Sequence, residues 1–272
     1  MDNNLGSYNY GSFSSNSEEL QRLRRQAEIA WSMEEEHLMT HGLQNGDTVA
    51  DLACGPGIIS SLIKREVCPD GLVIGVELNK SLLALARSMA EEADHAPEFR
   101  AGDVYELDCL EDGSIDFAYC RFVLQHLEEP ARALQSIFRK LRPGGRVAVL
   151  ETDDSLFDCT PDIPGMKRFL ETAAAEQKRR GGDRKIGRKL AGLLWENGFL
   201  DALTQVVTIN TDMIPGDEFL NITTRFKLEL IPGEDQDWAR ACLDRVQEAI
   251  DSGSFFGQTG VYMVSAARPP AD

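Results

Sequence analysis

Short apolar runs alternate with segments of helical periodicity between residues 48 and 151. Strands that alternate with helices form a parallel, doubly wound sheet, because each crossover returns the chain to the same end of the sheet. We therefore predict an α/β fold for this part of the chain. Strands are expected at 48–53, 72–77, 97–102, 114–120 and 146–151, and helices at 58–66, 80–93 and 129–141.

The strict alternation breaks after Glu151. A loop-like stretch is followed by further helical patterns and two more strand patterns, and the last strand is expected to return antiparallel beside its predecessor. Two segments, 152–183 and 211–259, are interpreted as insertions over one end of the sheet. The expected helices are 165–179, 184–197, 216–228 and 234–251, and the expected strands are 203–210 and 260–267.

Charge and composition limit the partners. The net charge of −17 opposes a broad phosphate-binding surface, so we expect no nucleic acid to bind. The two basic segments, 22–26 and 178–189, are interpreted as solvated faces. Six cysteines without C-x-x-C spacing indicate reduced thiols and a cytoplasmic protein. No apolar run has the ~18 residues that a membrane span needs, and no membrane association is expected.

A glycine-rich turn follows the first predicted strand, in the sequence "VADLACGPGIIS" (49–60). Glycines at such a turn let the backbone approach a ligand at the N-terminus of the next helix. Asp51 ends the strand, and Ser60 replaces the third glycine of a dinucleotide fingerprint. Glu77 closes the second strand, where a carboxylate accepts hydrogen bonds from ribose hydroxyls and repels a 2′-phosphate. Asp103 ends the third strand, within reach of an adenine amino group.

Five motifs together resemble the class I S-adenosylmethionine-dependent methyltransferases. They are "VADLACGPG", "GVELN", "AGDVYEL", "IDFAYCRFVLQHL" and "LRPGGRVAVLE". The resemblance implies a Rossmann-like, doubly wound sheet of seven strands with the last one antiparallel, to which this chain adds an N-terminal helical arm and helical cap insertions. We expect an arm and lid helix at 1–45, a cofactor-binding core at 46–151, and the rest of the sheet with the cap at 152–272.

The resemblance also implies the activity. The expected reaction moves the methyl group of S-adenosylmethionine to an oxygen, nitrogen or carbon atom of a small organic acceptor, of the kind made in secondary metabolism. The alternative is a protein of the same fold that binds S-adenosylmethionine but catalyses a non-methylating reaction, or acts as a non-catalytic partner. A nicotinamide-dependent oxidoreductase is a third reading, which Ser60 and the "AGD" strand end disfavour.

The cofactor contacts implied by the resemblance lie at strand ends. Asp51 would lie near the ammonium group of the methionine portion, Glu77 would hold the ribose, and Asp103 would bond the adenine amino group. Ala53 stands where the family has a glycine. The remaining implied contacts are Ala53, Gly55 and Gly57 around the methionine portion, Leu78 on the adenine, the Val104 N–H to a ring nitrogen, and Arg121 to the methionine carboxylate.

The segment "SEELQRLRRQAEIAW" resembles the N-terminal helix of many small-molecule methyltransferases. In that pattern Gln26 contacts the cofactor and an upstream tyrosine covers it, for which Tyr10 is the first choice and Tyr8 the second. The same arm is also a candidate surface for a homo-oligomer. The tyrosine face would make a cation–π contact with the sulfonium.

Other candidates concern the chemistry of transfer. His126 is the candidate general base, and the alternative is that this position is structural or contacts the cofactor, as is often the case in the family. His37 and His41 are expected to form a surface pair, and no metal is expected. Either Asp153 or Asp154 is a candidate acceptor contact. Four aromatic residues are candidates for the acceptor pocket, with core packing as the default for each: Trp31, Trp195, Phe169 and Phe219.

Overall fold

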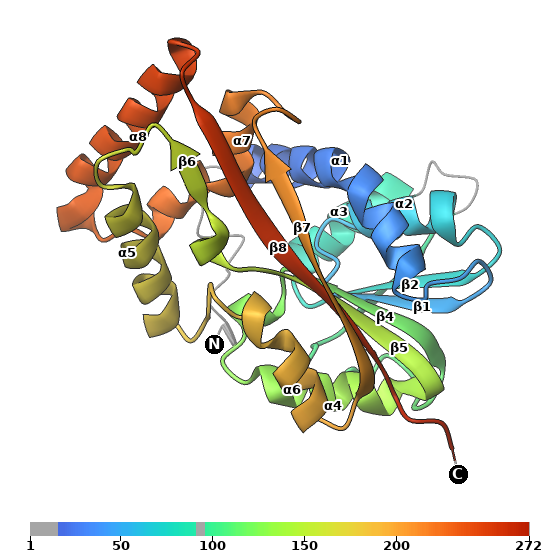
Figure 1. Cartoon of the computed structure of the whole chain (residues 1–272). Coiled ribbons are helices and arrows are strands. Elements are labelled where there is room, and N and C mark those ends of the chain that lie inside the picture. Colours follow the sequence, from blue (N-terminus) through green and yellow to red (C-terminus); the bar gives the residue numbers. More distant parts are fainter. Residues whose placement is uncertain (1–15, 91–95, 272) are drawn as a thin grey trace.

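The computed structural model describes residues 16–90 and 96–271, and these form one mixed sheet covered by helices (Figure 1). The strand order is β3-β2-β1-β4-β5-β8-β6, and β7 pairs with β8. Pairing is parallel from β3 through β5, whereas β8 runs antiparallel to β5, β6 and β7. The strands are β1 (Thr48–Leu52), β2 (Leu72–Glu77), β3 (Glu98–Ala101), β4 (Ile115–Arg121), β5 (Leu141–Thr152), β6 (Asp158–Thr160), β7 (Leu200–Asn210) and β8 (Phe256–Ala267).

The predicted α/β class, the parallel core and the antiparallel last strand are confirmed. The expected number of strands was one too low, because β6 adds an eighth in a stretch that resembled a loop. A strand of three residues is too short to show alternation, and β6 exists because its backbone pairs with the beginning of β8. The β8 strand begins at Phe256, four residues earlier than expected, and this early part is what pairs with β6.

The helices follow the predicted segments with altered ends. The predicted helix 58–66 is split into α2 (Ile58–Leu62) and a π-helix, η2 (Ile63–Val67). The helix predicted at 184–197 begins later, with η5 (Gly187–Lys189) and α6 (Leu190–Glu196). The others are α1 (Asn16–Thr40), α3 (Lys80–Ala90), η3 (Leu124–His126), α4 (Pro130–Lys140), η4 (Asp154–Leu156), α5 (Met166–Arg179), α7 (Gly216–Thr223), η6 (Arg225–Leu230), η7 (Gly233–Asp235) and α8 (Gln236–Asp251).

Three clusters of buried apolar side chains organise the packing. One lies under α4 and α6 on one face of the sheet, and a second lies under α1, α2 and η2 on the other. The third joins α5, α7 and α8 away from the parallel strands, where Figure 1 shows α5 and α8 side by side. The third cluster gives the cap its own small core, which can hold it as a unit over the sheet.

The long helix α1 crosses from the sheet to the cap. Ala27, Trp31 and Leu38 are buried against the sheet face, while Arg25 forms an ion pair with Glu218 of α7. This helix therefore connects the two parts that enclose the candidate site. Within residues 16–90 and 96–271, no helix is both long enough and apolar enough to cross a membrane.

Candidate cofactor and acceptor sites

The loop after β1 has three left-handed residues. Ala53, Gly55 and Gly57 have φ angles of 54°, 57° and 74°. At Gly57 an added Cβ would lie 2.5 Å from the Phe99 ring, so this position requires glycine for space as well as for conformation. Alanine at position 53 tolerates the left-handed conformation at a cost of about 1–2 kcal/mol, which explains the family preference for glycine there.

Glu77 holds this loop to the end of β2. Its Oε2 accepts the Gly55 N–H at 2.9 Å, and its Oε1 accepts the Asn79 N–H at 2.7 Å. Burial raises the pKa of the Glu77 carboxyl, while these backbone hydrogen bonds oppose that rise. The carboxyl group thus fixes the turns that follow two adjacent strands, and it stands at the edge where the ribose contact was predicted.

Asp51 is buried at the end of β1, and Ser60 Oγ donates a hydrogen bond to its Oδ2 at 2.5 Å. Burial raises the pKa of Asp51 to about 7, against the lowering effects of Ser60 and of Arg121. The serine that replaces the third glycine therefore partners this carboxyl group. A cation beside Asp51 would favour its ionised form, as expected for the ammonium group of the cofactor.

The remaining predicted cofactor contacts lie along the same edge. Glu77 pairs with Ala101 across β2 and β3, which brings Asp103 close to the end of β2. Asp103 Oδ1 accepts the Tyr105 N–H at 2.9 Å, and the side chain of Val104 is buried. Leu78 is 53% exposed although it follows a buried strand. An exposed leucine beside an acidic strand end fits a site that covers an adenine ring.

Arg121 has a protein partner that the sequence did not indicate. Its Nε and Nη2 donate to Glu34 of α1 at 2.8 and 2.7 Å, and Tyr119 donates its hydroxyl to the same carboxylate at 3.2 Å. The pair is nearly fully buried, and it ties α1 to the end of β4. The predicted contact of Arg121 with the methionine carboxylate stays a prediction, since Glu34 already supplies a carboxylate here.

His126 lies on η3 in a position poor for a general base. Burial and the positive charges of Arg184 and Arg22 lower the pKa of its imidazole to about 3. A group with this pKa is neutral at physiological pH and accepts a proton only weakly. The catalytic role of His126 stays a prediction, and the low pKa of its imidazole argues against proton transfer to it.

A cavity of about 90 Å³ lies between α1, the carboxyl ends of β4 and β5, and the cap. Gln26 lines it and also donates to the Ile222 carbonyl at 3.5 Å. Tyr10 and Tyr8 lie outside the described residues. The apolar lining consists of Ala30, Met33, Phe122, Leu150, Val207, Ile209, Ile222, Phe226 and Val261.

The four aromatic candidates for the pocket lie elsewhere. Phe169 and Phe219 are fully buried in or against the cap core, and Trp31 donates to Glu66 at 2.6 Å while packing on the sheet. Core packing is therefore confirmed for these three. It is wrong for Trp195, which is 71% exposed on α6, because the helix turns this residue away from the sheet.

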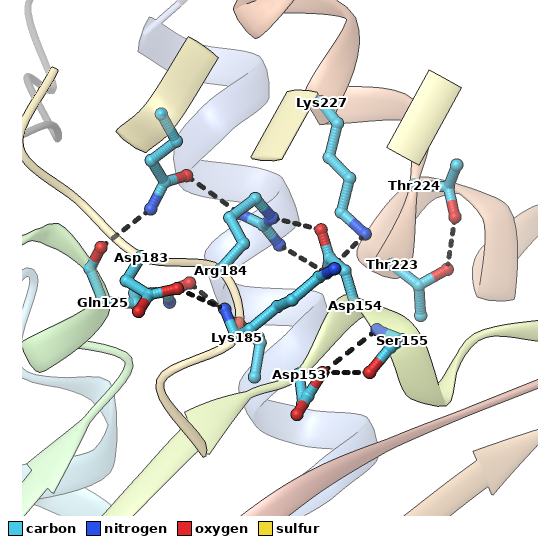
Figure 2. Close-up of polar contacts among 12 residues, drawn as sticks. Gln125, Asp153, Asp154, Ser155, Asp183, Arg184, Lys185, Thr223, Thr224 and Lys227 are labelled. Carbon is cyan, nitrogen blue, oxygen red and sulfur yellow. Dashed lines mark hydrogen bonds and ion pairs between the residues drawn. The ribbon is translucent and has the colours of Figure 1, made fainter. Parts of the chain in front are cut away.

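A buried ionic cluster forms one wall of the cavity (Figure 2). Arg184 donates from Nε and Nη2 to the Asp154 carboxylate, and Lys227 Nζ lies 3.0 Å from Asp154 Oδ1. Arg184 Nη1 also donates to Gln177 Oε1 at 3.1 Å. The prediction that segment 178–189 is solvated is therefore wrong at Arg184, which is 3% exposed, because Asp154 compensates its charge.

Asp153 and Asp154 have different partners. Asp153 pairs with Arg188 and accepts hydrogen bonds from Ser155, whereas Asp154 lines the cavity. Of the two candidate acceptor contacts, the structure thus favours Asp154. The sequence alone could not show which of the two adjacent aspartates faces the cavity, because the turn at η4 decides the direction of each side chain.

The expectation of a surface histidine pair is wrong for His41. Its ring is buried, with Nδ1 2.7 Å from Ser265 Oγ and Nε2 2.9 Å from Gln205 Oε1. The end of α1 lies against β7 and β8, which sequence spacing within one helix cannot show. Among the residues that the structure describes, no three His, Cys, Asp or Glu side chains are grouped so as to hold a metal ion.

Comparison with known proteins identifies the core. Residues 50–149 match a family model described as a methyltransferase domain. This part of the chain is a methyltransferase domain. The residues of this domain fit S-adenosylmethionine, the cofactor that the sequence motifs imply, through the glycine cradle at Gly57 and the acidic strand ends Asp51 and Glu77.

Two curated relatives extend beyond this methyltransferase domain. An uncharacterized 37.1 kDa protein in transposon TN4556 of Streptomyces fradiae is 33% identical over 227 residues, 83% of this chain and 64% of that protein. The demethylmenaquinone methyltransferase of Listeria welshimeri is 31% identical over 143 residues, 52% of this chain and 57% of that protein. The chain thus spans less than two-thirds of the length of either relative.

A solved structure shares the fold. Phosphoethanolamine N-methyltransferase 2 of Haemonchus contortus, in complex with S-adenosyl-L-methionine, superposes with a TM-score of 0.61 at 17% identity. The match covers 96% of this chain and 59% of that one. It supports the arrangement of the sheet and helices around the methyltransferase domain.

Proposed function

We propose that this protein transfers the methyl group of S-adenosylmethionine to a small organic acceptor bound in the cavity beneath the cap. The observation that carries the proposal is the position of the cavity. Arg121 and Glu34 line it, and both act electrostatically on Asp51 at the end of β1. The cavity therefore borders the edge of the sheet where the predicted cofactor residues meet.

S-adenosylmethionine, when bound, supplies a methyl carbon on a positively charged sulfur, which leaves as a neutral thioether. The protein's own task is to align an acceptor atom and to exclude water. The apolar cavity walls from α1, β7 and η6 serve the second purpose. The Arg121–Glu34 ion pair helps to align the acceptor, because it fixes α1, which lines the cavity, against the end of β4.

This proposal keeps the predicted division of the chain, with a lid at 1–45, a cofactor core at 46–151 and a cap within 152–272. An oxygen, nitrogen or carbon acceptor is compatible with it, and so is an acceptor from secondary metabolism. It assigns no proton transfer to His126, whose low pKa makes it a weak base. The proposed cofactor contacts are the residues at the strand ends, namely Asp51, Ala53, Gly55, Gly57, Glu77, Leu78, Asp103, Val104 and Arg121.

The first test is calorimetric titration of the full chain with S-adenosylmethionine, S-adenosylhomocysteine and NAD. We expect micromolar binding of the first two and none of NAD, since Glu77 lies where a ribose binds and Ser60 breaks the dinucleotide pattern. Transfer of a labelled methyl group to pools of small phenols, amines and carboxylic acids then follows. Binding of NAD alone, or of none of the three, would refute the proposal.

A further inference from the structure

The ionic cluster at the cavity has more positive than negative charge. Arg184, Lys227 and Asp154 are all buried, and the two cations share a single carboxylate. Arg184 donates three hydrogen bonds, two to Asp154 and one to Gln177. Among residues 16–90 and 96–271, the only side-chain hydrogen-bond acceptor of the Lys227 ammonium is Asp154, and the centroid of the Phe226 ring lies 5.9 Å from its nitrogen. Two of its three N–H donors are therefore available to a ligand.

The surrounding titratable groups leave this excess in place. Burial raises the pKa of Glu151 to about 8, which favours its neutral form. His126 is neutral for the reason given above. The other nearby charges are already paired: Arg22 with Glu19, Arg121 with Glu34, and Arg188 with Asp153.

A buried charge without a full counter-charge is costly, and an anionic group of a ligand would supply the missing compensation. Burial, with the neighbouring charge of Arg184, lowers the pKa of Lys227 to about 8, which reflects this incomplete compensation. Asp154 keeps the ammonium oriented toward the cavity, which Lys227 and Arg184 both line. Apolar side chains that line the same cavity include Met33, Leu150 and Val261.

We propose that the acceptor has an apolar body and one acidic oxygen group, which binds the Lys227 ammonium as an oxyanion. The Asp154–Arg184 pair acts as the support that fixes Lys227. The cavity extends from this cluster to Arg121 and Phe122 at the cofactor edge. An acceptor anchored at Lys227 would therefore place its other end toward the methyl donor. This inference rests on the proposed function.

The binding test uses the full chain saturated with S-adenosylhomocysteine. The anionic probes are p-nitrophenol, whose ionised form is yellow, and p-nitrobenzoate, and their neutral counterparts are p-nitroanisole and p-nitrobenzamide. We expect the wild type to bind at least one anion about tenfold or more tightly than its neutral counterpart. Which anion is preferred distinguishes a phenol-like from a carboxylate acceptor. For the phenol, the yellow ionised form is expected to increase on binding at a pH below its free pKa.

Substitutions distinguish binding by the Lys227 ammonium from effects of lost surface charge or of misfolding. Lys227→Met is expected to abolish the preference for the anion, and Lys227→Arg to retain it in part. Lys185→Met, at an exposed lysine next to Arg184, is the matched control and is expected to bind the probes as the wild type does. Thermal melting and S-adenosylhomocysteine affinity report whether each variant is folded.

Three results would overturn the inference: no saturable binding of either anion, equal binding of the anionic and neutral probes, or an unchanged preference in folded Lys227→Met. Each of these differs from failure of the proposed function, which would appear as loss of S-adenosylhomocysteine binding by the wild type. The wild-type titration with this product is therefore completed first.

Discussion

The cofactor edge and the acceptor cavity are built in different ways. At the cofactor edge, one carboxylate, Glu77, accepts backbone N–H groups from Gly55 and Asn79, all within a few residues of two strand ends. At the cavity, Asp154 meets Arg184 and Lys227, which are 30 and 73 residues away in the chain. The first region depends on local turns and the second on long-range charge pairing, so substitutions in the two should fail differently.

The largest effect is expected at the cavity, from Asp154→Ala. This change leaves Arg184 and Lys227 buried without a counter-charge, and the free energy of unfolding should fall by about 4 kcal/mol. Urea denaturation measures it. Asp244→Ala, at an exposed position on α8, is the control and should change stability by less than about 0.5 kcal/mol. Equal effects of the two would show that the cluster carries little stability.

At the cofactor edge, Gly57→Ala combines two penalties. The position has a φ of 74°, and its new Cβ would meet the Phe99 ring. We expect a loss of about 3 kcal/mol in urea denaturation, together with weaker cofactor binding. Gly46→Ala is the matched control, because its φ is 97° but no atom lies within 4 Å of the new Cβ. That variant should lose only about 1 kcal/mol. If both lose the same amount, the contact with Phe99 is unimportant.

Glu77→Ala tests binding rather than folding. Removal of the carboxyl group takes away the predicted ribose contact and releases the Gly55 N–H, so affinity for S-adenosylhomocysteine should fall about 100-fold, or ~2.7 kcal/mol. Calorimetry measures the affinity, and circular dichroism checks that the fold persists. Glu111→Ala, at an exposed glutamate, should bind normally. Unchanged affinity in Glu77→Ala would remove this residue from the site.

The smallest effect is a pH dependence at Asp51. Its pKa of about 7 in the folded state lies above the unfolded value, so the folded protein binds the extra proton and stability falls as pH rises toward 7 and beyond. From roughly pH 6 to pH 8, deprotonation of Asp51 should lower the free energy of unfolding by about 1.4 kcal/mol. Asp51→Asn should remove that slope, seen as a difference between wild-type and variant denaturation curves. Parallel curves across this range would show that Asp51 is ionised throughout.

The pKa of Asp154 is shifted in the opposite direction from that of Asp51, so the two groups change the stability of the protein with opposite dependence on pH. Arg184 and Lys227 hold its pKa at about 2, below the unfolded value, despite burial. Its contribution to stability is therefore present above the unfolded pKa and is lost as pH falls through the folded one. A rise in pH through neutrality thus weakens the cofactor edge through Asp51, while strong acid weakens the cavity through Asp154.

Sequence patterns predicted local features well. The β2 strand was predicted with its observed ends, and the glycine loop occurs where the spacing indicated. Ser60 was read only as a missing glycine, and its bond to Asp51 needed the packed helix. Basic segment 178–189 was interpreted from charge alone. That reading failed at Arg184, whose counter-charge lies in another element.

By itself, the sequence determined the alternating parallel core, the antiparallel last strand and the acidic strand ends of the cofactor edge. Each depends on periodicity or on neighbours within one turn, which a single chain displays directly. Only the tertiary structure decided the partners of Arg121, the burial of Arg184 and Lys227, and the cavity that they line. A buried charge is stable only beside its partner, and the meeting of distant residues is fixed by the packing of the cap and α1 onto the sheet.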